Sequence, residues 1–350
     1  MYYSQSARLA IYAEGEFGRH SKTAEGVIAY GRNPVVAVID SRLSGKTVQE
    51  LTGIKKAIPI VGSVAEALGH KPEALLLGTA WSGGHLPDHW RADIIYALTN
   101  GLDVINGLHD FLADDPQIAE VARQHKRLLL DVRRPPEGLP IGDGKALNTP
   151  ACIVLSVGSD CSVGKMTVAL ELTAEAERRG HTAKFVATGQ TGIMICGEGI
   201  AIDRVIGDFM SGAVEEMVVA AAKGHEFVFV EGQGSLVHPG FSGVTLSLMH
   251  GSCPHIMILC HKPSRKTINE THFAIPGYKR LIDIYQSMSA CLRPARIVGI
   301  ALNTRDLDET QAQRAILEAE QETGLSACDP VRSGAGKLFD AIIAFKEKAL

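Results

Sequence analysis

The sequence predicts an α/β protein with two parallel-sheet domains. Short apolar runs typical of buried strands alternate with helical stretches through both halves of its 350 residues. That length exceeds what one small core usually holds. Between the halves, residues 133–148 (RRPPEGLPIGDGKALN) are rich in proline and glycine, as linkers are. We expect an N-terminal Rossmann-like domain over 1–132, a linker, and a doubly wound P-loop NTPase-like domain over 149–350.

The elements follow from the hydrophobic pattern. In the first half we expect strands at 9–13, 35–40, 58–61, 74–77, 103–106 and 128–131, and helices at 22–31, 64–68, 88–99 and 117–125. In the second half we expect strands at 153–157, 184–187, 227–230, 255–259 and 296–301, and helices at 165–179, 213–223, 244–250, 282–289, 309–323 and 335–347.

The most informative stretch is IVLSVGSDCSVGKMTVAL at 153–170. An apolar strand leads into a small polar loop that ends in Gly164-Lys165, and a helix-forming run follows. In this layout the backbone N–H groups of the loop, the lysine and the helix N-terminus all favour a phosphate group. The ligand is therefore expected to be a nucleotide or another phosphorylated molecule. The alternative is a plain glycine turn with an exposed lysine.

This loop departs from the strict phosphate-loop pattern at two places. Ser159 stands where that pattern has glycine, while Gly158 is one residue too far from Gly164. Met166 follows the lysine in place of the usual Mg²⁺-binding hydroxyl, and Thr167 comes one residue later. Magnesium binding is thus an open question.

A second motif supports the first. The buried-strand run at 227–230 ends in Glu231, followed by Gly232, Gln233 and Gly234. In phosphate-loop folds an acidic residue at such a strand end organises the metal, and ligands bind at the carboxyl ends of parallel strands. We expect a metal or catalytic role for Glu231, against the alternative of an ordinary surface glutamate. His238, in the loop that follows, is either a base or a structural histidine.

The N-terminal half carries weaker signals. Gly15 and Gly18 do not form the G-x-G-x-x-G fingerprint, so NAD is not supported. Residues 78–91 (GTAWSGGHLPDHWR) form a glycine-rich turn before a helix. Arg91 there is either a clamp for a carboxylate or phosphate, or a surface residue of a tight connection.

Composition narrows the classes of function. A net charge of −4 and a pI near 6.4 disfavour a nucleic-acid partner. No apolar run approaches the length of a membrane span, and the N-terminus lacks a signal-peptide pattern. Seven cysteines without paired spacing indicate reduced thiols in a cytoplasmic protein. Cys161, inside the loop, is either reactive or a small packing residue.

Two resemblances extend this interpretation. GSDCSVGKMT, KFVATG, VEGQG and IALNTRD occur in the order of similar motifs in dethiobiotin synthetase, where the asparagine, here Asn303, contacts the nucleotide base. The resemblance implies that fold for the second half. It also implies cofactor contacts along the loop, at Gly158, Ser159, Asp160, Cys161, Ser162, Val163, Gly164, Lys165, Met166 and Thr167.

The closer resemblance runs nearly end to end. GTAWSGGHLPDHWR, GLHDFL, TGQTGIM, VEGQGSLVHPG and DPVRSGAGKL are similar to a bacterial two-domain P-loop family that includes D-glutamate N-acetyltransferases. It implies acetyl-CoA as donor, a D-amino acid as small-molecule acceptor, and a homodimer or higher homo-oligomer.

Roles follow from the chemistry under this resemblance. Glu231 or His238 would be the base, and Lys165 would hold the phosphates of CoA or the oxyanion. Substrate contacts are expected at Arg91, Gln190, Thr191 and Arg204.

Two other functions stay open. An ATP-dependent enzyme of the dethiobiotin synthetase type would need Mg²⁺, held by Thr167, Asp160 and Glu231. A nucleotide-binding regulatory module would bind nucleotide with little turnover.

Overall fold

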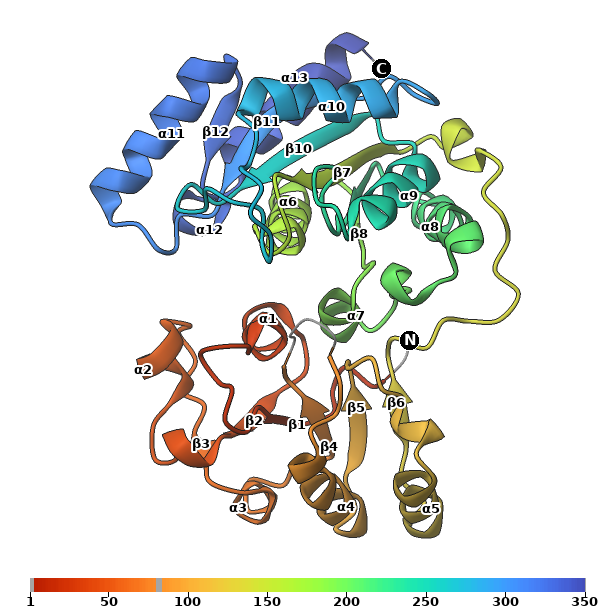
Figure 1. The fold of residues 1–350 in the computed structure, drawn as a ribbon, viewed down its shortest axis with the longest axis vertical. Coiled ribbons are helices and arrows are strands. Elements are labelled where there is room, and N and C mark those ends of the chain that lie inside the picture. Colours follow the sequence, from red (N-terminus) through yellow and green to blue (C-terminus); the bar gives the residue numbers. More distant parts are fainter. Residues whose placement is uncertain (1–2, 80–83, 350) are drawn as a thin grey trace. The chain divides into compact units, whose positions relative to one another are not determined.

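The computed structural model describes residues 3–79 and 84–349, and its chain divides into two compact units (Figure 1). The N-terminal unit contains the described residues up to Pro135 together with Gly189–Arg204. The C-terminal unit contains Pro136–Thr188 and the described residues from Val205 onward. The chain therefore passes from one unit to the other three times.

The N-terminal unit is built on a parallel sheet of six strands in the order β3-β2-β1-β4-β5-β6. The strands are β1 (Leu9–Tyr12), β2 (Val35–Ile39), β3 (Ile60–Val61), β4 (Ala74–Leu77), β5 (Asp103–Asn106) and β6 (Leu129–Asp131). Its helices are α1 (Lys22–Tyr30), α2 (Val48–Thr52), α3 (Val64–Leu68), α4 (Arg91–Thr99), α5 (Pro116–His125) and α7 (Gln190–Cys196). This order is that of a Rossmann fold and confirms the predicted class, with its switch point between β1 and β4.

The core of this unit follows from apolar strands packed against helices. Tyr12 of β1 meets Trp90 edge to face, with ring centroids 4.8 Å apart, and both side chains are buried. Trp90 belongs to the short 3₁₀ turn η2 (Asp88–Trp90), so the helix expected over 88–99 begins as this turn and continues as α4. At the start of α5, Asp115 caps the helix and Pro116 occupies the first turn, where its missing N–H costs nothing.

Helix α7 packs in the N-terminal unit although it lies deep in the second half of the sequence. It lies beside α1, and the hydroxyls of Thr23 and Thr191 share a buried hydrogen bond of 2.8 Å (Figure 1). Gly107, just after β5, faces Met194, whose Cε would lie 2.9 Å from a Cβ at that position. The expected boundary placed 189–204 in the second domain. The structure packs this segment at the carboxyl end of the first sheet instead.

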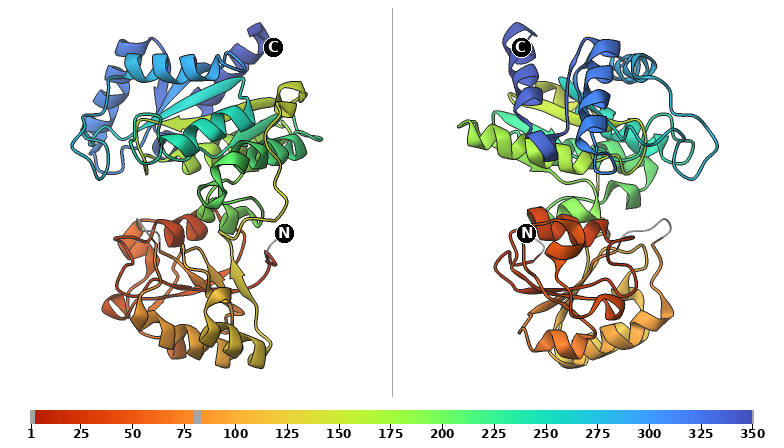
Figure 2. Two further views of the ribbon diagram at one scale, coloured as in Figure 1. Left: turned by 45° about the vertical axis from the view of Figure 1, so that its right-hand side comes forward. Right: turned by 90° about the vertical axis from the view of Figure 1, so that its left-hand side faces the viewer.

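The C-terminal unit has its own parallel sheet (Figure 2). The order of its strands is β12-β11-β10-β7-β9-β8. Its strands are β7 (Cys152–Gly158), β8 (Ala183–Val186), β9 (Phe227–Val230), β10 (Ile256–His261), β11 (Arg296–Leu302) and β12 (Ser326–Cys328). Its helices are α6 (Lys165–Arg178), α8 (Gly207–Ala221), α9 (Ser242–Ser252), α10 (Tyr278–Ser289), α11 (Glu309–Thr323), α12 (Pro330–Ser333) and α13 (Gly336–Ala349). The predicted doubly wound P-loop architecture is confirmed.

Four of the described helices and strands were not anticipated: α2, α7, α12 and β12. Helix α7 contains Gly192 and is flanked by Gly189 and Gly197, so its intrinsic helix propensity is low and its packing against α1 stabilises it. Strand β12 is only three residues long and pairs with β11 alone. Within 3–79 and 84–349, no helix is long and apolar enough to cross a bilayer.

Candidate functional site

The phosphate loop joins β7 to α6 in the C-terminal unit. Gly164 has a φ of +107°, and the preceding turn also holds Ser162 at +53°. This left-handed backbone suits glycine best. A Cβ on Gly158 would lie 2.9 Å from Lys165 Nζ and 3.0 Å from the carbonyl oxygen of Asp160. Glycines at both ends therefore allow the loop to close tightly around the lysine.

Lys165 lies inside this loop. Its side chain is buried, and Nζ donates to the carbonyl oxygen of Asp160 at 2.7 Å. The ammonium group is thus held next to the start of α6, where the helix dipole and the amide groups also favour an anion. The structure brings together the cationic elements that the loop pattern predicted.

Asp160 fastens the loop to the segment that follows β10. Its fully buried carboxylate accepts from Arg265 Nη1 and from the Asn269 N–H, both at 2.8 Å, and from the Cys161 N–H at 2.7 Å. Arg265 also donates to the Cys161 carbonyl at 2.6 Å. Both carboxylate oxygens are therefore engaged, which favours a structural role for Asp160 over the Mg²⁺-ligand role that the ATP-dependent alternative would require. Sequence reasoning missed Arg265.

Buried hydroxyls support the loop from behind. The Gly158 carbonyl accepts from the Tyr285 hydroxyl at 2.7 Å and from Ser235 Oγ at 2.8 Å. Ser159 Oγ lies 2.8 Å from Nδ1 of His261. Burial, with the nearby charges of Lys266 and Arg265, lowers the pKa of His261 to about 4. That imidazole is therefore neutral at neutral pH.

Glu231 lies at the end of β9, which pairs with β7. Its buried Oε2 accepts from the Thr188 N–H at 2.9 Å, and the Thr188 hydroxyl donates back to the Glu231 carbonyl at 2.8 Å. A Cβ on the next residue, Gly232, would fall 1.7 Å from the Ser156 carbonyl oxygen and 3.1 Å from Cδ of Lys165. The glycine therefore lets this strand end approach the lysine closely.

His238 is buried, and both of its ring nitrogens are engaged. Nδ1 accepts from the Gly240 N–H at 3.1 Å, so Nε2 carries the proton toward the Asn269 carbonyl, also at 3.1 Å. The potential ligand atoms of Asp160, Cys161 and His238 lie within 4.8 Å of one another. Hydrogen bonds already occupy the nitrogen and carboxylate ligands, so this cluster is better explained as part of the loop support than as a metal centre.

Three other residues predicted to contact the ligand lie on the first turn of α6 or beside the loop. Met166 is buried and Thr167 is partly exposed on the first turn of α6. Asn303, just after β11, is beside the loop, since its Cβ lies 3.8 Å from the position of a Cβ on Gly164.

The other predicted substrate residues belong to the N-terminal unit. Arg91 forms a two-pronged ion pair with Asp115, at 2.6 and 2.9 Å, so its fork is already used at the start of α5. Residues 80–83 of the same motif lie outside the described residues. Gln190 and Thr191 begin α7, and the exposed Arg204 lies over the ring of Phe111 at 4.8 Å.

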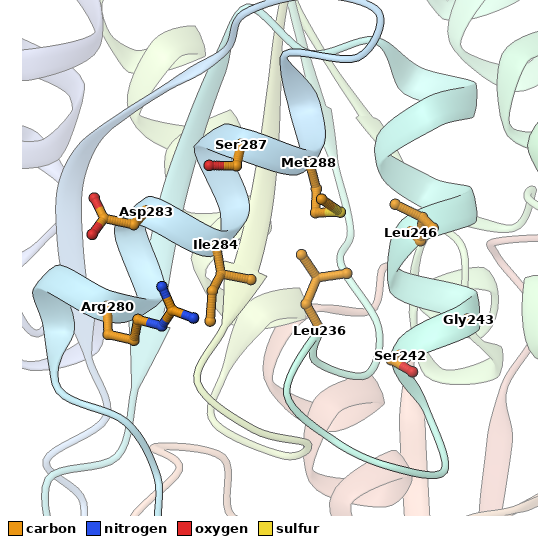
Figure 3. A pocket seen from close by; sticks show the side chains of 9 residues that line it. All are labelled: Leu236, Ser242, Gly243, Leu246, Arg280, Asp283, Ile284, Ser287 and Met288. Atoms are coloured by element: carbon orange, nitrogen blue, oxygen red, sulfur yellow. The ribbon is translucent and has the colours of Figure 1, made fainter.

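A groove of about 460 Å³ lies between α9 and α10 (Figure 3). Leu236, Leu246, Ile284 and Met288 converge on its centre, while Arg280 lies toward one end. Two links connect the groove to the loop. Leu236 follows Ser235, and Ile284 precedes Tyr285, so both groove residues are next to groups that hold the Gly158 carbonyl.

Comparison with known proteins agrees with both halves of this description. Residues 140–339 match the P-loop domain of a family described as a domain of unknown function, DUF1611, and residues 41–135 match its Rossmann-like N-terminal domain. The chain belongs to the DUF1611 family. A crystal structure of a DUF1611 protein from Anabaena variabilis is 41% identical, covers 97% of this chain and 100% of its own, and superposes with a TM-score of 0.93.

Two further relatives have a named activity. A D-glutamate N-acetyltransferase from Tritonibacter scottomollicae is 42% identical over 80% of this chain and 83% of its own length. One of the same name from a Pseudoalteromonas species is 36% identical over 81% of this chain and 83% of its own. The family resemblance drawn from the sequence motifs is confirmed.

Proposed function

We propose that this protein is a D-glutamate N-acetyltransferase that takes its acetyl group from acetyl-CoA. Two relatives, 36% and 42% identical to this chain, are named D-glutamate N-acetyltransferase, a name that does not include the acetyl donor. The observation that carries the proposal is the loop itself. It surrounds Lys165 as a phosphate cradle, yet the buried Met166 replaces the hydroxyl that would hold Mg²⁺. A cradle of this kind suits a phosphorylated donor whose phosphates are gripped and not transferred.

Coenzyme A fits such a cradle. Its phosphates would contact Lys165 and the N–H groups at the start of α6, as anions do at helix N-termini. Its pantetheine arm carries methyl and methylene groups between two amides. The groove lined by Leu236, Leu246, Ile284 and Met288 would offer apolar contacts to those groups. Asn303, which lies next to Gly164, would contact the adenine base.

The transfer requires one proton to leave the acceptor before the new bond forms. The ammonium group of D-glutamate loses a proton to a base, and its nitrogen attacks the thioester carbonyl. The carbon–sulfur bond then breaks, and the CoA thiolate leaves and is protonated. We assign the base to Glu231, because both nitrogens of His238 are held in hydrogen bonds. Arg204 is the better carboxylate clamp, because the guanidinium of Arg91 is paired with Asp115.

The direct test is thiol release from acetyl-CoA in the presence of D-glutamate, L-glutamate or neither, with a metal chelator. A parallel set without chelator contains ATP and Mg²⁺, and product formation is measured in both sets. We expect D-glutamate to release CoA thiol and form the N-acetyl product without added Mg²⁺. Turnover that requires ATP and Mg²⁺ would instead support the ligase alternative. A homodimer and a cytoplasmic location belong to the proposal and can be tested by light scattering and cell fractionation.

The variant Glu231→Gln tests the base. It keeps an oxygen able to accept from the Thr188 N–H, so the fold is expected to persist, while kcat falls by about 10²–10⁴-fold as for loss of a general base. Glu226→Gln, at the partly exposed start of the same strand, serves as the control. Full turnover by Glu231→Gln would remove this residue from the mechanism.

A further inference from the structure

A cluster of charged side chains in the N-terminal unit lies outside the phosphate-loop site. His109 and Phe111 follow β5, Arg133 follows β6, and Asp203 and Arg204 belong to the 3₁₀ turn η5 (Ile202–Arg204). Both strands end at the carboxyl edge of the parallel sheet, where ligands bind in folds of this type. The turn η5 comes from the segment that the second half of the sequence contributes to this unit.

Asp203 has hydrogen-bonding capacity left over. Its Oδ2 is paired with Nη1 of Arg133, which also donates through Nε to the Gly107 carbonyl at 2.7 Å. Its Oδ1 is buried and has no hydrogen-bond partner among the described residues. Native structures seldom leave a buried carboxylate oxygen unpaired. A ligand N–H group donated to Oδ1 would complete the set.

Arg204, the next residue in the chain, supplies a cation close enough to His109 to act on its charge. Its guanidinium lies 4.8 Å from the centroid of the Phe111 ring, which also contacts Arg134 at 4.2 Å. Arg134 is paired with Asp114 at 2.6 Å, whereas Arg204 has no ion pair within the described part of the chain. A guanidinium over a ring can still offer N–H groups to the two oxygens of a carboxylate.

His109 adds a neutral acceptor. Its Nε2 lies 4.0 Å from Asp203 Oδ2, too far for a hydrogen bond. Burial lowers the pKa of this histidine, and the charge of Arg133 adds to that effect, with smaller contributions from Arg204 and His85, while Asp203 opposes it. The ring is thus neutral at neutral pH and does not repel an ammonium group.

We infer that Asp203, His109 and Arg204 form the binding site for an acidic α-amino acid. Oδ1 of Asp203 and the imidazole of His109 receive the ammonium group, and Arg204 receives a carboxylate. The inference rests on the proposed function, since D-glutamate, an acidic α-amino acid, is the acceptor of that reaction. It also gives a function to the segment 189–204, which carries two of the three residues near its end.

The test compares D-glutamate with glutarate, which has both carboxylates but lacks the ammonium group. Each is titrated calorimetrically into the full-length protein, with and without saturating CoA. We expect the unmodified protein to bind D-glutamate more tightly than glutarate. Asp203→Asn should lower D-glutamate affinity by about tenfold or more and leave glutarate affinity unchanged or improved, because only the ammonium contact is lost.

Arg204→Met provides a second test, which remains available if Asp203→Asn does not fold because the ion pair with Arg133 is lost. Arg204 is exposed, so its replacement should leave the melting temperature unchanged and weaken D-glutamate and glutarate alike, by about tenfold. Glu120→Gln, on the outer surface of α5 and paired only with neighbours on that helix, is the matched control.

The outcomes separate this site from the proposed reaction. Unchanged ligand preference in a folded Asp203→Asn protein, unchanged binding in Arg204→Met, or no binding of either ligand to the unmodified protein would overturn the site. Binding with the expected preference but without N-acetylation would retain the site and reject the reaction. Acetylation with an unchanged KM for D-glutamate in both variants would retain the reaction and reject the site.

Discussion

Asp160 lies in the phosphate loop and Asp203 in the turn η5. Each has a buried carboxylate oxygen and pairs with an arginine, yet their surroundings differ. Asp160 has donors on both oxygens, from Arg265, Asn269 and Cys161. Asp203 pairs through one oxygen with Arg133 and leaves the other buried without a partner among the described residues. A closed set of hydrogen bonds holds a loop in shape, whereas an incomplete one is ready for a ligand.

The difference explains how charge is used in the two units. In the phosphate loop, Asp160 and the hydroxyls of Tyr285 and Ser235 fix the backbone, so that the ligand-facing groups are the lysine and the amides. In the N-terminal unit, the proposed amino-acid site would use the side chains themselves to contact the ligand. Burial of a charge therefore does not by itself identify a binding residue, and the proposal for Asp203 depends on its unused hydrogen-bonding capacity.

The largest expected effect comes from removing the two aspartates. Asp160→Ala should lower the free energy of unfolding by about 3–5 kcal/mol, because it leaves Arg265 and two N–H groups without their buried acceptor. Asp203→Ala should cost less, about 1–3 kcal/mol, since only Arg133 loses a partner.

Urea unfolding of both variants, followed by fluorescence and circular dichroism, measures the two costs. The decisive result is which of the two variants loses more unfolding free energy. If Asp203→Ala destabilised the protein as much as Asp160→Ala, the distinction between a closed and an incomplete set would be untenable.

Acid should weaken the loop support through His261. The pKa of this histidine is lowered from 6.5 to about 4 in the fold, so between these values the unfolded chain binds more protons than the folded one. Stability is therefore fully present above pH 6.5 and is lost as pH falls toward 4, by about 3 kcal/mol from this group at 1.36 kcal/mol per pKa unit.

Comparison with His261→Gln isolates that contribution. The variant should lose less unfolding free energy than the unmodified protein when both are compared at pH 7 and pH 4.5. His255, whose pKa is also lowered to about 4, titrates equally in both proteins. An identical pH dependence in the two proteins would contradict the assignment to His261.

A smaller effect is expected from Tyr285→Phe. The hydroxyl donates to the Gly158 carbonyl at 2.7 Å and accepts from the Leu236 N–H at 3.1 Å. Its loss should cost about 1–2 kcal/mol of unfolding free energy and also weaken CoA binding, because the loop loses a support. Tyr96→Phe, on an exposed helix position of the other unit, is the control. A destabilised variant with unaltered CoA affinity would separate loop support from ligand binding.

The smallest expected effect concerns the attachment of α7. Thr23→Val and Thr191→Val each remove one hydroxyl of their shared hydrogen bond. A double-mutant cycle should give a coupling of about 0.5–1.5 kcal/mol, as for a single neutral hydrogen bond. A coupling near zero would mean that apolar packing alone holds α7 beside α1.

Local sequence signals were sufficient for much of the fold. The glycine spacing around Lys165 and the apolar runs of the strands are short-range features, and they predicted the loop and both sheets. The contacts of Arg265 and Asn269 with Asp160 join residues more than 100 positions apart. The sequence around the loop therefore contains no signal that predicts these contacts. Asp160 and Asp203 are the same residue type, so the sequence alone does not distinguish them, whereas their hydrogen-bond partners in the structure do.

The packing of residues 189–204 in the N-terminal unit could not be predicted from the sequence for a related reason. The segment follows β8 in sequence, so continuity assigned it to the second domain. Its glycines weakened the helix signal of α7, and its true partners, Thr23 and Gly107, lie far away in the chain. Neither periodicity nor composition carries information about such a partner.

The central claim is that the phosphate loop grips the donor through Lys165. The most direct measurement is calorimetric titration of CoA, and separately of ATP with Mg²⁺, into the unmodified protein, Lys165→Met and the control Lys223→Met, an exposed lysine at the end of α8. We predict that CoA binds, that Lys165→Met weakens it by about tenfold to a hundredfold, as for loss of a charge-assisted contact, and that the control is unaffected. Equal CoA binding by Lys165→Met, or binding of ATP with Mg²⁺ but not of CoA, would contradict the claim.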